Sequence, residues 1–385
     1  MGRMGGIDTA LAGFVGCGRL LWRQGGNRKL LTCSRPVSLS IPGGGGRSKK
    51  WIGPSAREVS RRGDVSVQAV KKPPVAAEME LNPAATGRGG QMVVWLQDVL
   101  RLHDNPALTF AAEDASSVLV IYIFDRRITH VDRKEDAQKV RFLMDSLEDL
   151  RCSLRKMGSD LALIDGEPEK IIPKICKGIG ARALAFHRAV TKPGIEIERR
   201  LMDNLEDANV ESNRLWSSTM YRLEDTPFNL RTIPWEYEQF EKEVNRDGVL
   251  RESLPKLTKF PPPPSNFDFG SVPAWISSVA GEGVREGGET AALKVLEDRL
   301  ATELRSGKSS STAPWSIGPW LELGCLSPLL VKEQLLNIAT KLTKERLRTL
   351  NTELILWDFF RFISLVKSIM NIEAHLPKES KSIIP

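Results

Sequence analysis

Apolar residues gather in strand-length runs between residues 92 and 218 of the chain, with amphipathic segments between them. The runs MVVWL (92–96) and SVLVIYIF (117–124) are continuously apolar, which is typical of strands buried on both faces of a sheet. We expect further strands at 161–164, 182–186 and 213–218. Apolar positions at helical spacing predict the intervening helices at 106–115, 136–158, 168–180 and 193–208. This alternation predicts a doubly wound parallel α/β sheet, whose ligands lie at the carboxyl ends of the strands.

Past Tyr221 the alternation of strands and helices stops. Residues 223–244 indicate a loop and one helix, and KFPPPPSNF (259–267) has the composition of a polyproline linker. From about Gly288 the pattern is helical, with helices expected at 289–304, 327–342 and 344–369. We therefore divide the chain into a leader (1–90), an α/β domain (91–225), a proline-rich connection (226–287) and an all-α domain (288–385).

The composition is that of a soluble globular protein, with 41% hydrophobic and 27% charged residues among 385. No run approaches 18 apolar residues, so we expect no membrane-spanning helix. The net charge of +7 is concentrated at the start of the chain: residues 1–57 hold ten Lys or Arg and one acid, Asp8. The rest of the chain carries about −2, so a DNA-binding face would have to be a local basic patch.

The leader is rich in Gly and Ser, poor in acids, and has no hydrophobic core pattern. This composition favours an organellar transit peptide, for a chloroplast before a mitochondrion. A secretory signal fits less well, because the apolar stretch ALAGFVGCG is short and Arg19 interrupts it. A plain disordered tail is the remaining alternative.

Several other kinds of site find little support. The five cysteines are scattered without a Cys-x-x-Cys pair, and the four histidines are far apart, so we expect neither a zinc site nor a disulfide framework. The segment SGKS (306–309) follows a predicted helix and lacks the earlier glycine of a phosphate loop. No Gly-x-Ser-x-Gly motif offers a hydrolase nucleophile.

The segment VVWLQDVLRLHDNPALTF (93–110) joins a strand to a helix. Asp104 or Asn105 can cap that helix, with Pro106 at its first position, where a missing N–H costs nothing. Within the wider string, however, WLQDVLRLHDNPAL resembles the first strand-to-helix turn of the cryptochrome/photolyase family. Three further blocks resemble family motifs in the same order: LWSSTMYRLEDTPF (215–228), PWLELGCLSP (319–328) and ELILWDFFRF (353–362).

The resemblance is strongest to DASH-type cryptochromes and to the short plant photolyase-like blue-light receptor. It implies a Rossmann-like α/β antenna domain that can hold a folate, followed by a helical domain that binds FAD. In this family blue light excites the flavin, which either splits pyrimidine dimers in DNA by electron transfer or serves in signalling. DNA is therefore a partner implied by the resemblance.

The family motifs also imply site residues. Glu353 and Trp357 are the candidate catalytic residues at the substrate and flavin cavity. The candidate cofactor-binding residues are Ser316, Ile317, Gly318, Trp320 and Asp358.

The chain departs from the family pattern at several of these positions. Gln97 and Val99 replace the usual Arg and Asp of the first turn, and Ala189 stands where DASH-type members have an acid that helps to hold the folate. Pro314, Trp315 and Gly318 stand where the flavin phosphate loop of the family carries hydroxyls.

The chain also ends before the family's last helices. We therefore expect 354–370 to expose an apolar helix that would favour a protein partner or a homo-oligomer. The sequence leaves two hypotheses open. The protein is either a flavin-dependent photoreceptor or photolyase, or a non-catalytic relative that binds a ligand or a protein.

Overall fold

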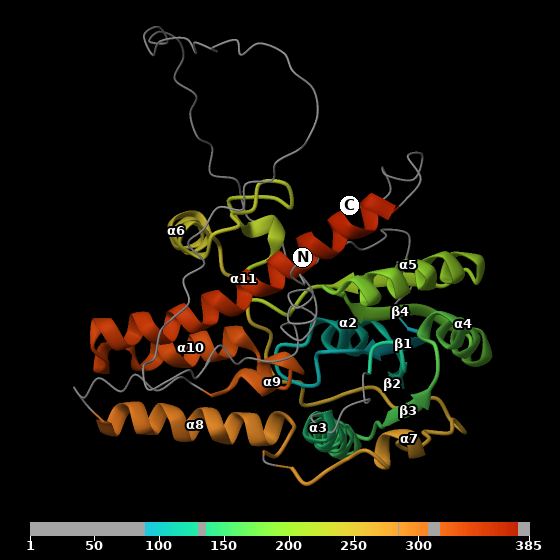
Figure 1. Ribbon diagram of the computed structural model, residues 1–385. Coiled ribbons are helices and arrows are strands. Elements are labelled where there is room, and N and C mark those ends of the chain that lie inside the picture. Colours follow the sequence, from blue (N-terminus) through green and yellow to red (C-terminus); the bar gives the residue numbers. More distant parts are fainter. Residues whose placement is uncertain (1–88, 130–135, 284, 307–315, 376–385) are drawn as a thin grey trace, which may run out of the picture. The chain divides into compact units, whose positions relative to one another are not determined.

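Five parallel strands form the sheet of the α/β domain, as the hydrophobic pattern predicts (Figure 1). The computed structural model describes residues 89–129, 136–283, 285–306 and 316–375, all in one compact unit, and the leader prediction lies outside them. The strand order is β3-β2-β1-β4-β5, so the topology reverses direction between β1 and β4. The strands are β1 (Gln91–Leu96), β2 (Ser117–Phe124), β3 (Leu161–Asp165), β4 (Ala181–His187) and β5 (Glu211–Leu215). The last strand therefore begins earlier than predicted and ends before Trp216.

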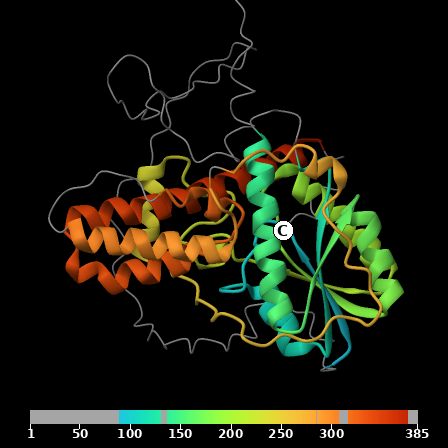
Figure 2. The same cartoon turned by 90° about the horizontal axis from the view of Figure 1, so that it is seen from below.

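Helices cover both faces of the sheet (Figure 2). Along β1, Met92, Val94 and Leu96 join one hydrophobic core, whereas Val93 and Trp95 join the core on the opposite face. This alternation explains why the strand is apolar at every position. The first face packs on α2 (Pro106–Asp114) and α3 (Asp136–Lys156), and the second packs on α4 (Pro168–Ile179) and α5 (Lys192–Asp207).

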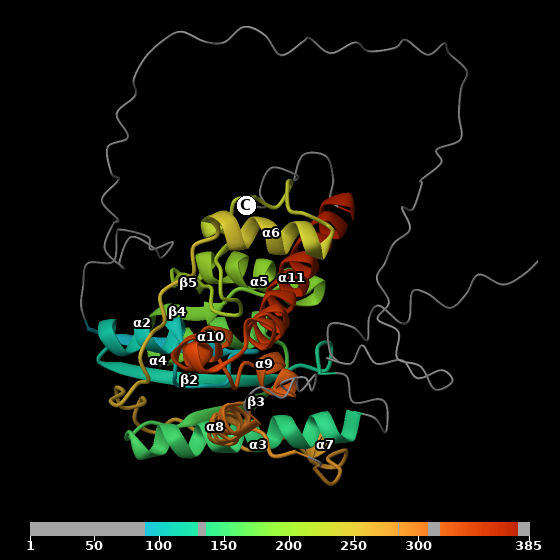
Figure 3. The same ribbon diagram turned by 90° about the vertical axis from the view of Figure 1, so that its left-hand side faces the viewer.

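From Glu289 onward the described chain is helical, in agreement with the expected all-α region (Figure 3). Ser327 caps α10 by accepting the N–H groups of Leu329 and Leu330, with Pro328 as the first helical residue. No helix in the described ranges combines the length and apolarity needed to cross a bilayer. The elements are η2 (Leu223–Asp225), α6 (Tyr237–Asp247), α7 (Ala274–Ser277), α8 (Glu289–Ser306), α9 (Gly318–Glu322), α10 (Pro328–Ile338), η3 (Ala339–Lys341) and α11 (Lys344–His375).

The proline-rich segment lies along the sheet and is hydrogen-bonded to its strands, so it is not a free linker between the two domains. The carbonyl of Pro262 accepts the N–H of Val118 at the start of β2, and that of Phe269 accepts the N–H of Leu163 in β3. Phe260 is buried in the core. The segment is therefore packed against the α/β domain, and the prediction of a polyproline linker from composition is wrong in this respect.

Helix α11 is not the exposed apolar helix that we expected from the sequence. It packs against α5, α6 and α10, and Leu354, Phe362 and Val366 are almost fully buried. Among the large apolar residues of α11 whose side chains are described, only Phe360 (44%) and Met370 (52%) are markedly exposed. The expectation of a broadly exposed apolar face is therefore wrong for this part of the chain, because these three helices of the same chain cover it.

Candidate functional site

The turn after β1 is fixed by capping and by an unusual backbone conformation. Asn105 is the N-cap of α2, since its side-chain oxygen accepts the N–H of Leu108 at 3.1 Å. Asp104 has φ 52°, a left-handed conformation that is uncommon for a residue with a side chain. The cap therefore belongs to Asn105, and this leaves the carboxylate of Asp104 free to make contacts elsewhere.

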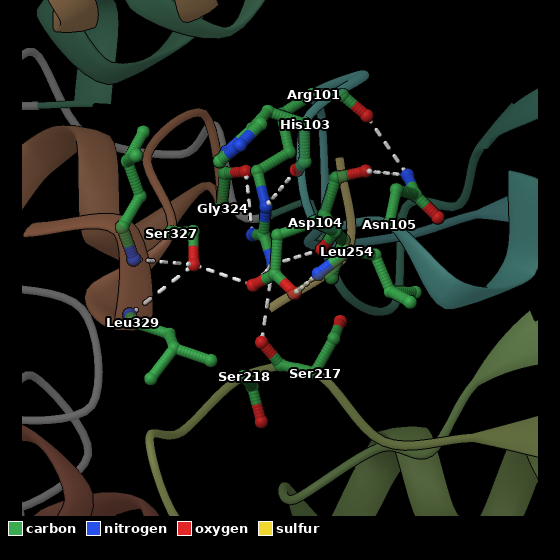
Figure 4. A network of polar contacts seen from close by, with 12 residues as sticks. Arg101, His103, Asp104, Asn105, Ser217, Ser218, Leu254, Gly324, Ser327 and Leu329 are labelled. Atoms are coloured by element: carbon green, nitrogen blue, oxygen red, sulfur yellow. Dashed lines mark hydrogen bonds and ion pairs between the residues drawn. The ribbon is translucent and has the colours of Figure 1, made fainter. Parts of the chain in front are cut away.

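The carboxylate of Asp104 lies at the centre of a buried polar network (Figure 4). It accepts two hydrogen bonds from the guanidinium of Arg251, at 2.6 and 2.5 Å, and one from the hydroxyl of Ser327. Arg101 approaches it at 3.4 Å and also donates to the carbonyl of Gly324 at 3.0 Å. We call Arg101, Asp104, Arg251 and Ser327 the junction network, because they join the first turn of the sheet to the start of α10.

Electrostatics within the junction network stabilise the charged form of Asp104. Burial by itself raises the pKa of this carboxyl, but the hydrogen bonds and charge of Arg251, with a contribution from Arg101, outweigh it and the pKa is lowered. Burial lowers the pKa of the Arg101 guanidinium. Removing one partner from a buried, paired arrangement of this kind is strongly destabilising, because it leaves a buried charge uncompensated.

Backbone carbonyls of residues 217–221 accept hydrogen bonds from side chains of several different parts of the chain. The carbonyl of Ser217 accepts from Arg101 and Arg251, and that of Thr219 accepts from Arg251 at 2.8 Å. The carbonyl of Ser218 accepts the indole N–H of Trp357 at 3.0 Å. This segment carries the second family motif, and its role in the fold is to connect the sheet to α11.

The α11 candidates lie against this same segment. Oδ2 of Asp358 accepts the N–H groups of Met220 and Tyr221 at 2.8 and 3.2 Å, and the residue is fully buried. Trp357 is half-buried, with the guanidinium carbon of Arg361 5.7 Å from its ring centroid. Glu353 lies one helical turn before Trp357 and therefore on the same side of α11.

The α9 candidates lie in a different environment. Trp320 is buried, its ring meets Phe142 of α3 edge-on at 5.6 Å, and its indole N–H donates to the carbonyl of Glu286 at 3.1 Å. Ile317 is also buried, whereas Gly318 is partly exposed and a Cβ added there would meet no atom within 4 Å. Ser316 has φ 58°, and its carbonyl accepts from Arg285 at 3.3 Å.

The seven candidate residues thus form two groups, one at α9 and one at α11. Glu322 of α9 is a further, partly buried acid, and the positive charge of Arg361 on α11 acts on its carboxyl. Burial raises the pKa of Glu322 to about 7, and Lys139 and Arg361 oppose that shift. Residues 307–315, where the rest of the family's phosphate loop would fall, lie outside the described residues.

The carboxyl edge of the sheet carries functional groups that the sequence did not single out. Arg361 of α11 forms a 2.6 Å ion pair with Asp98, which follows β1. The hydroxyls of Ser364 and Ser368 both donate to the carbonyl of Val190, beyond the end of β4. Helix α11 therefore lies over the reversal point between β1 and β4, where ligands of such sheets bind.

Beneath this cover are two buried titratable groups. His187, at the end of β4, is only 3% exposed, and neither ring nitrogen has a hydrogen-bond partner in the described structure. Burial lowers its pKa to about 3, so the ring is neutral. Burial raises the pKa of Glu198 to about 8, although that carboxyl accepts the N–H of Ala189. Ala189, the altered antenna position, is itself buried. Within the described ranges no cluster of His, Cys, Asp and Glu could hold a metal ion.

Comparison with known proteins extends over most of the described chain. The DNA photolyase family model matches residues 92–264. The Arabidopsis thaliana protein named Blue-light photoreceptor PHR2 is 32% identical over 307 residues, which cover 71% of this chain and 69% of that one. Cryptochrome DASH, chloroplastic/mitochondrial, from the same plant is 31% identical over 303 residues, covering 72% of this chain and 52% of that one.

The structural comparison agrees with the sequence comparison. The crystal structure of a cryptochrome from Synechocystis sp. PCC6803 matches with a TM-score of 0.66 and 27% identity, over 72% of this chain and 61% of that one. The chain spans 59% and 60% of the length of two cyanobacterial relatives. These similarities, with four motifs in order on the predicted fold, confirm the resemblance: the chain belongs to the cryptochrome/photolyase family.

Proposed function

We propose that this chain is a blue-light flavoprotein of the cryptochrome type, with FAD held between the α9 and α11 groups. The observation that carries this proposal is the extended similarity to the photoreceptor and cryptochrome relatives, which includes the motifs on both helices. The flavin, when bound, supplies blue-light absorption and electron transfer. Photoreception is favoured over DNA repair, because the relative of which this chain covers 69% is named a blue-light photoreceptor.

Part of the candidate site fits a flavin nucleotide. At the α9 end, the open space beside Gly318 and the exposed guanidinium of Arg285 offer an approach for the phosphates. At the α11 end, Glu353 and Trp357 share one side of the helix. Trp320 and Asp358, in contrast, are engaged in the protein's own packing, so we assign them to positioning α9 and α11.

A non-catalytic relative is the second candidate. It is favoured by the replacements in the phosphate loop, where Gly318 stands at a serine position of the family pattern and so presents no hydroxyl to a phosphate. In that case the α/β domain and α11 would serve a ligand or a protein without photochemistry. Folate binding belongs to neither proposal, because Ala189 stands where DASH-type members have the acid that helps to hold the folate.

Adding FAD to the purified full chain is expected to leave structured flavin absorption bands that survive gel filtration. Gly318→Asp should weaken this binding by about tenfold or more, because its carboxylate would repel the phosphates and each 1.4 kcal/mol is a factor of ten. Gly178→Asp on α4, where a Cβ also meets no atom within 4 Å, is the matched control and should bind FAD normally.

A colourless wild-type protein would contradict the flavin proposal and support the non-catalytic relative. Equal binding by the two variants would place the flavin away from α9. If the bands survive, a light-driven repair assay on DNA that contains pyrimidine dimers separates photoreceptor from photolyase.

We also propose import into an organelle, with the chloroplast favoured. The support is the basic, acid-poor composition of residues 1–57 and the name of the plant cryptochrome relative. Residues 1–90 fused to a fluorescent protein should direct it to chloroplasts in leaf cells. Replacing Arg19, Arg23 and Arg28 by alanine should reduce import, and a cytosolic signal from the unaltered fusion would refute the proposal.

A further inference from the structure

Two side chains of α11, Trp357 and Asp358, bond to the backbone of residues 217–221, and Asp358 is the titratable one of the two. Asp358 is fully buried and uses only Oδ2, which accepts the N–H groups of Met220 and Tyr221. Its other oxygen, Oδ1, has no hydrogen-bond partner in the described structure. A carboxylate in this position would therefore be incompletely solvated by the protein, which disfavours its charged form.

No cation forms an ion pair with Asp358 among the described residues. The charges of Arg251 and Arg361 act on its carboxyl, but each guanidinium is paired with another carboxylate. Arg251 binds Asp104 at 2.5 Å, and Arg361 binds Asp98 at 2.6 Å. Burial and the charge of Asp358 raise the pKa of Tyr221 to about 12, so its phenol stays neutral.

We propose that the charge on Asp358 controls the docking of α11: the neutral carboxyl keeps the helix on the Ser217–Tyr221 segment, and the ionised carboxylate favours its release. The same helix covers the carboxyl edge of the sheet through Arg361, Ser364 and Ser368. Release would thus uncover the reversal point between β1 and β4, including His187. Ionisation of Asp358 would thereby make access to this edge of the sheet dependent on pH.

The pH window follows from the direction of the shift. Burial raises the pKa of Asp358 to about 8, against opposing effects of the two N–H groups and the two guanidiniums. A raised carboxyl pKa gives stability that is fully present below the pKa of the released state, near 4, and is lost as pH rises toward 8. Within that range the opening equilibrium should rise about tenfold per pH unit from this group alone.

Other titratable groups lie close to α11, and their contributions to the pH dependence must be distinguished from that of Asp358. On α5, Glu198 has a pKa raised to about 8 by burial, and on α9 Glu322 has one raised to about 7. Both act in the same direction as Asp358. His187 stays neutral above about pH 3 and contributes no change between pH 5 and 8.

Hydrogen exchange in α11 tests the proposal in the full chain. Protection factors for peptides covering residues 355–370, corrected for intrinsic exchange, should fall with pH between about 5 and 7.5. Asp358→Asn keeps an acceptor for both N–H groups but carries no charge, so its slope should be smaller by about one log unit per pH unit. Asp203→Asn, an exposed carboxyl on α5, is the matched control and should keep the wild-type slope.

Equal slopes in wild type and Asp358→Asn would overturn the proposal. Should the variant fail to fold, the wild-type protein labelled with ¹³C at aspartate carboxyls gives a second test. One aspartate should then titrate near pH 8, since the other aspartates with displaced pKa values, Asp104 and Asp160, are shifted downward. A spectrum in which every aspartate titrates below pH 5 would also overturn it.

Discussion

Replacing Asp104 by alanine is expected to destabilise the protein by about 3–5 kcal/mol, the usual cost of removing one partner from a buried ion pair. The substitution leaves the guanidiniums of Arg101 and Arg251, which are 1% and 5% exposed, facing each other without a counter-charge. It also removes the acceptor of the Ser327 hydroxyl. The loss is a large part of the 5–15 kcal/mol that usually separates folded and unfolded states. Urea unfolding at pH 7 measures it directly.

The matched control for Asp104 is an exposed ion pair on α5. Asp203 lies 3.3 Å from Arg199, and the two side chains are 66% and 52% exposed, so Asp203→Ala should cost no more than about 1 kcal/mol. Because the pKa of Asp104 is lowered, its contribution is present at neutral pH and is lost only as pH falls through the folded-state pKa. Similar losses for the two variants at pH 7 would show that Asp104 contributes no more to stability than an exposed ion pair does.

Phe362→Ala is expected to cost about 3–5 kcal/mol, because it opens a cavity in the core beneath α11. Phe362 is fully buried, lies parallel to Trp216 with ring centroids 5.9 Å apart, and meets Phe240 at 6.0 Å. Phe360 on the same helix is 44% exposed, so Phe360→Ala should change stability by only about 0.5 kcal/mol. Thermal or urea unfolding of the pair tests whether α11 is integral to the fold, and equal effects would contradict that conclusion.

Hydrophobic patterning predicted most of the α/β fold, because strands buried on both faces and amphipathic helices have distinct periods. The predicted strand at 117–124 coincides with β2. The prediction is wrong at β5, a polar edge strand of sequence ESNRL, because the apolar Trp216 lies beyond its end. Helix α9 was missed because its five residues are too few to show a helical period.

The candidate site was predictable only as far as its motifs. Those motifs located residues on α9 and α11, but they could not show that Trp320 packs on α3 or that Trp357 bonds to Ser218. Arg251 and Asp104 are 147 residues apart, and Arg361 and Asp98 are 263 apart. The hydrophobic periodicity of a sequence carries no information about contacts between residues this far apart, so these ion pairs could be found only from the tertiary structure. The burial of α11 was not predictable from the sequence either, because two of the helices that cover it, α5 and α6, are far from it along the chain.

The distances along the chain within the junction network also determine the order in which the molecule can assemble. The strands β1 and β2 are neighbours in sequence and in the sheet, so their pairing closes only a short loop. The contacts of Arg101 with Gly324 and of Asp104 with Ser327 each close a loop of 223 residues. Because closing longer loops is slower, the sheet can form early, whereas the junction closes late. During synthesis on the ribosome, the guanidinium of Arg101 and the carboxylate of Asp104 must therefore remain without their partners from the α9–α10 turn until residue 327 has emerged.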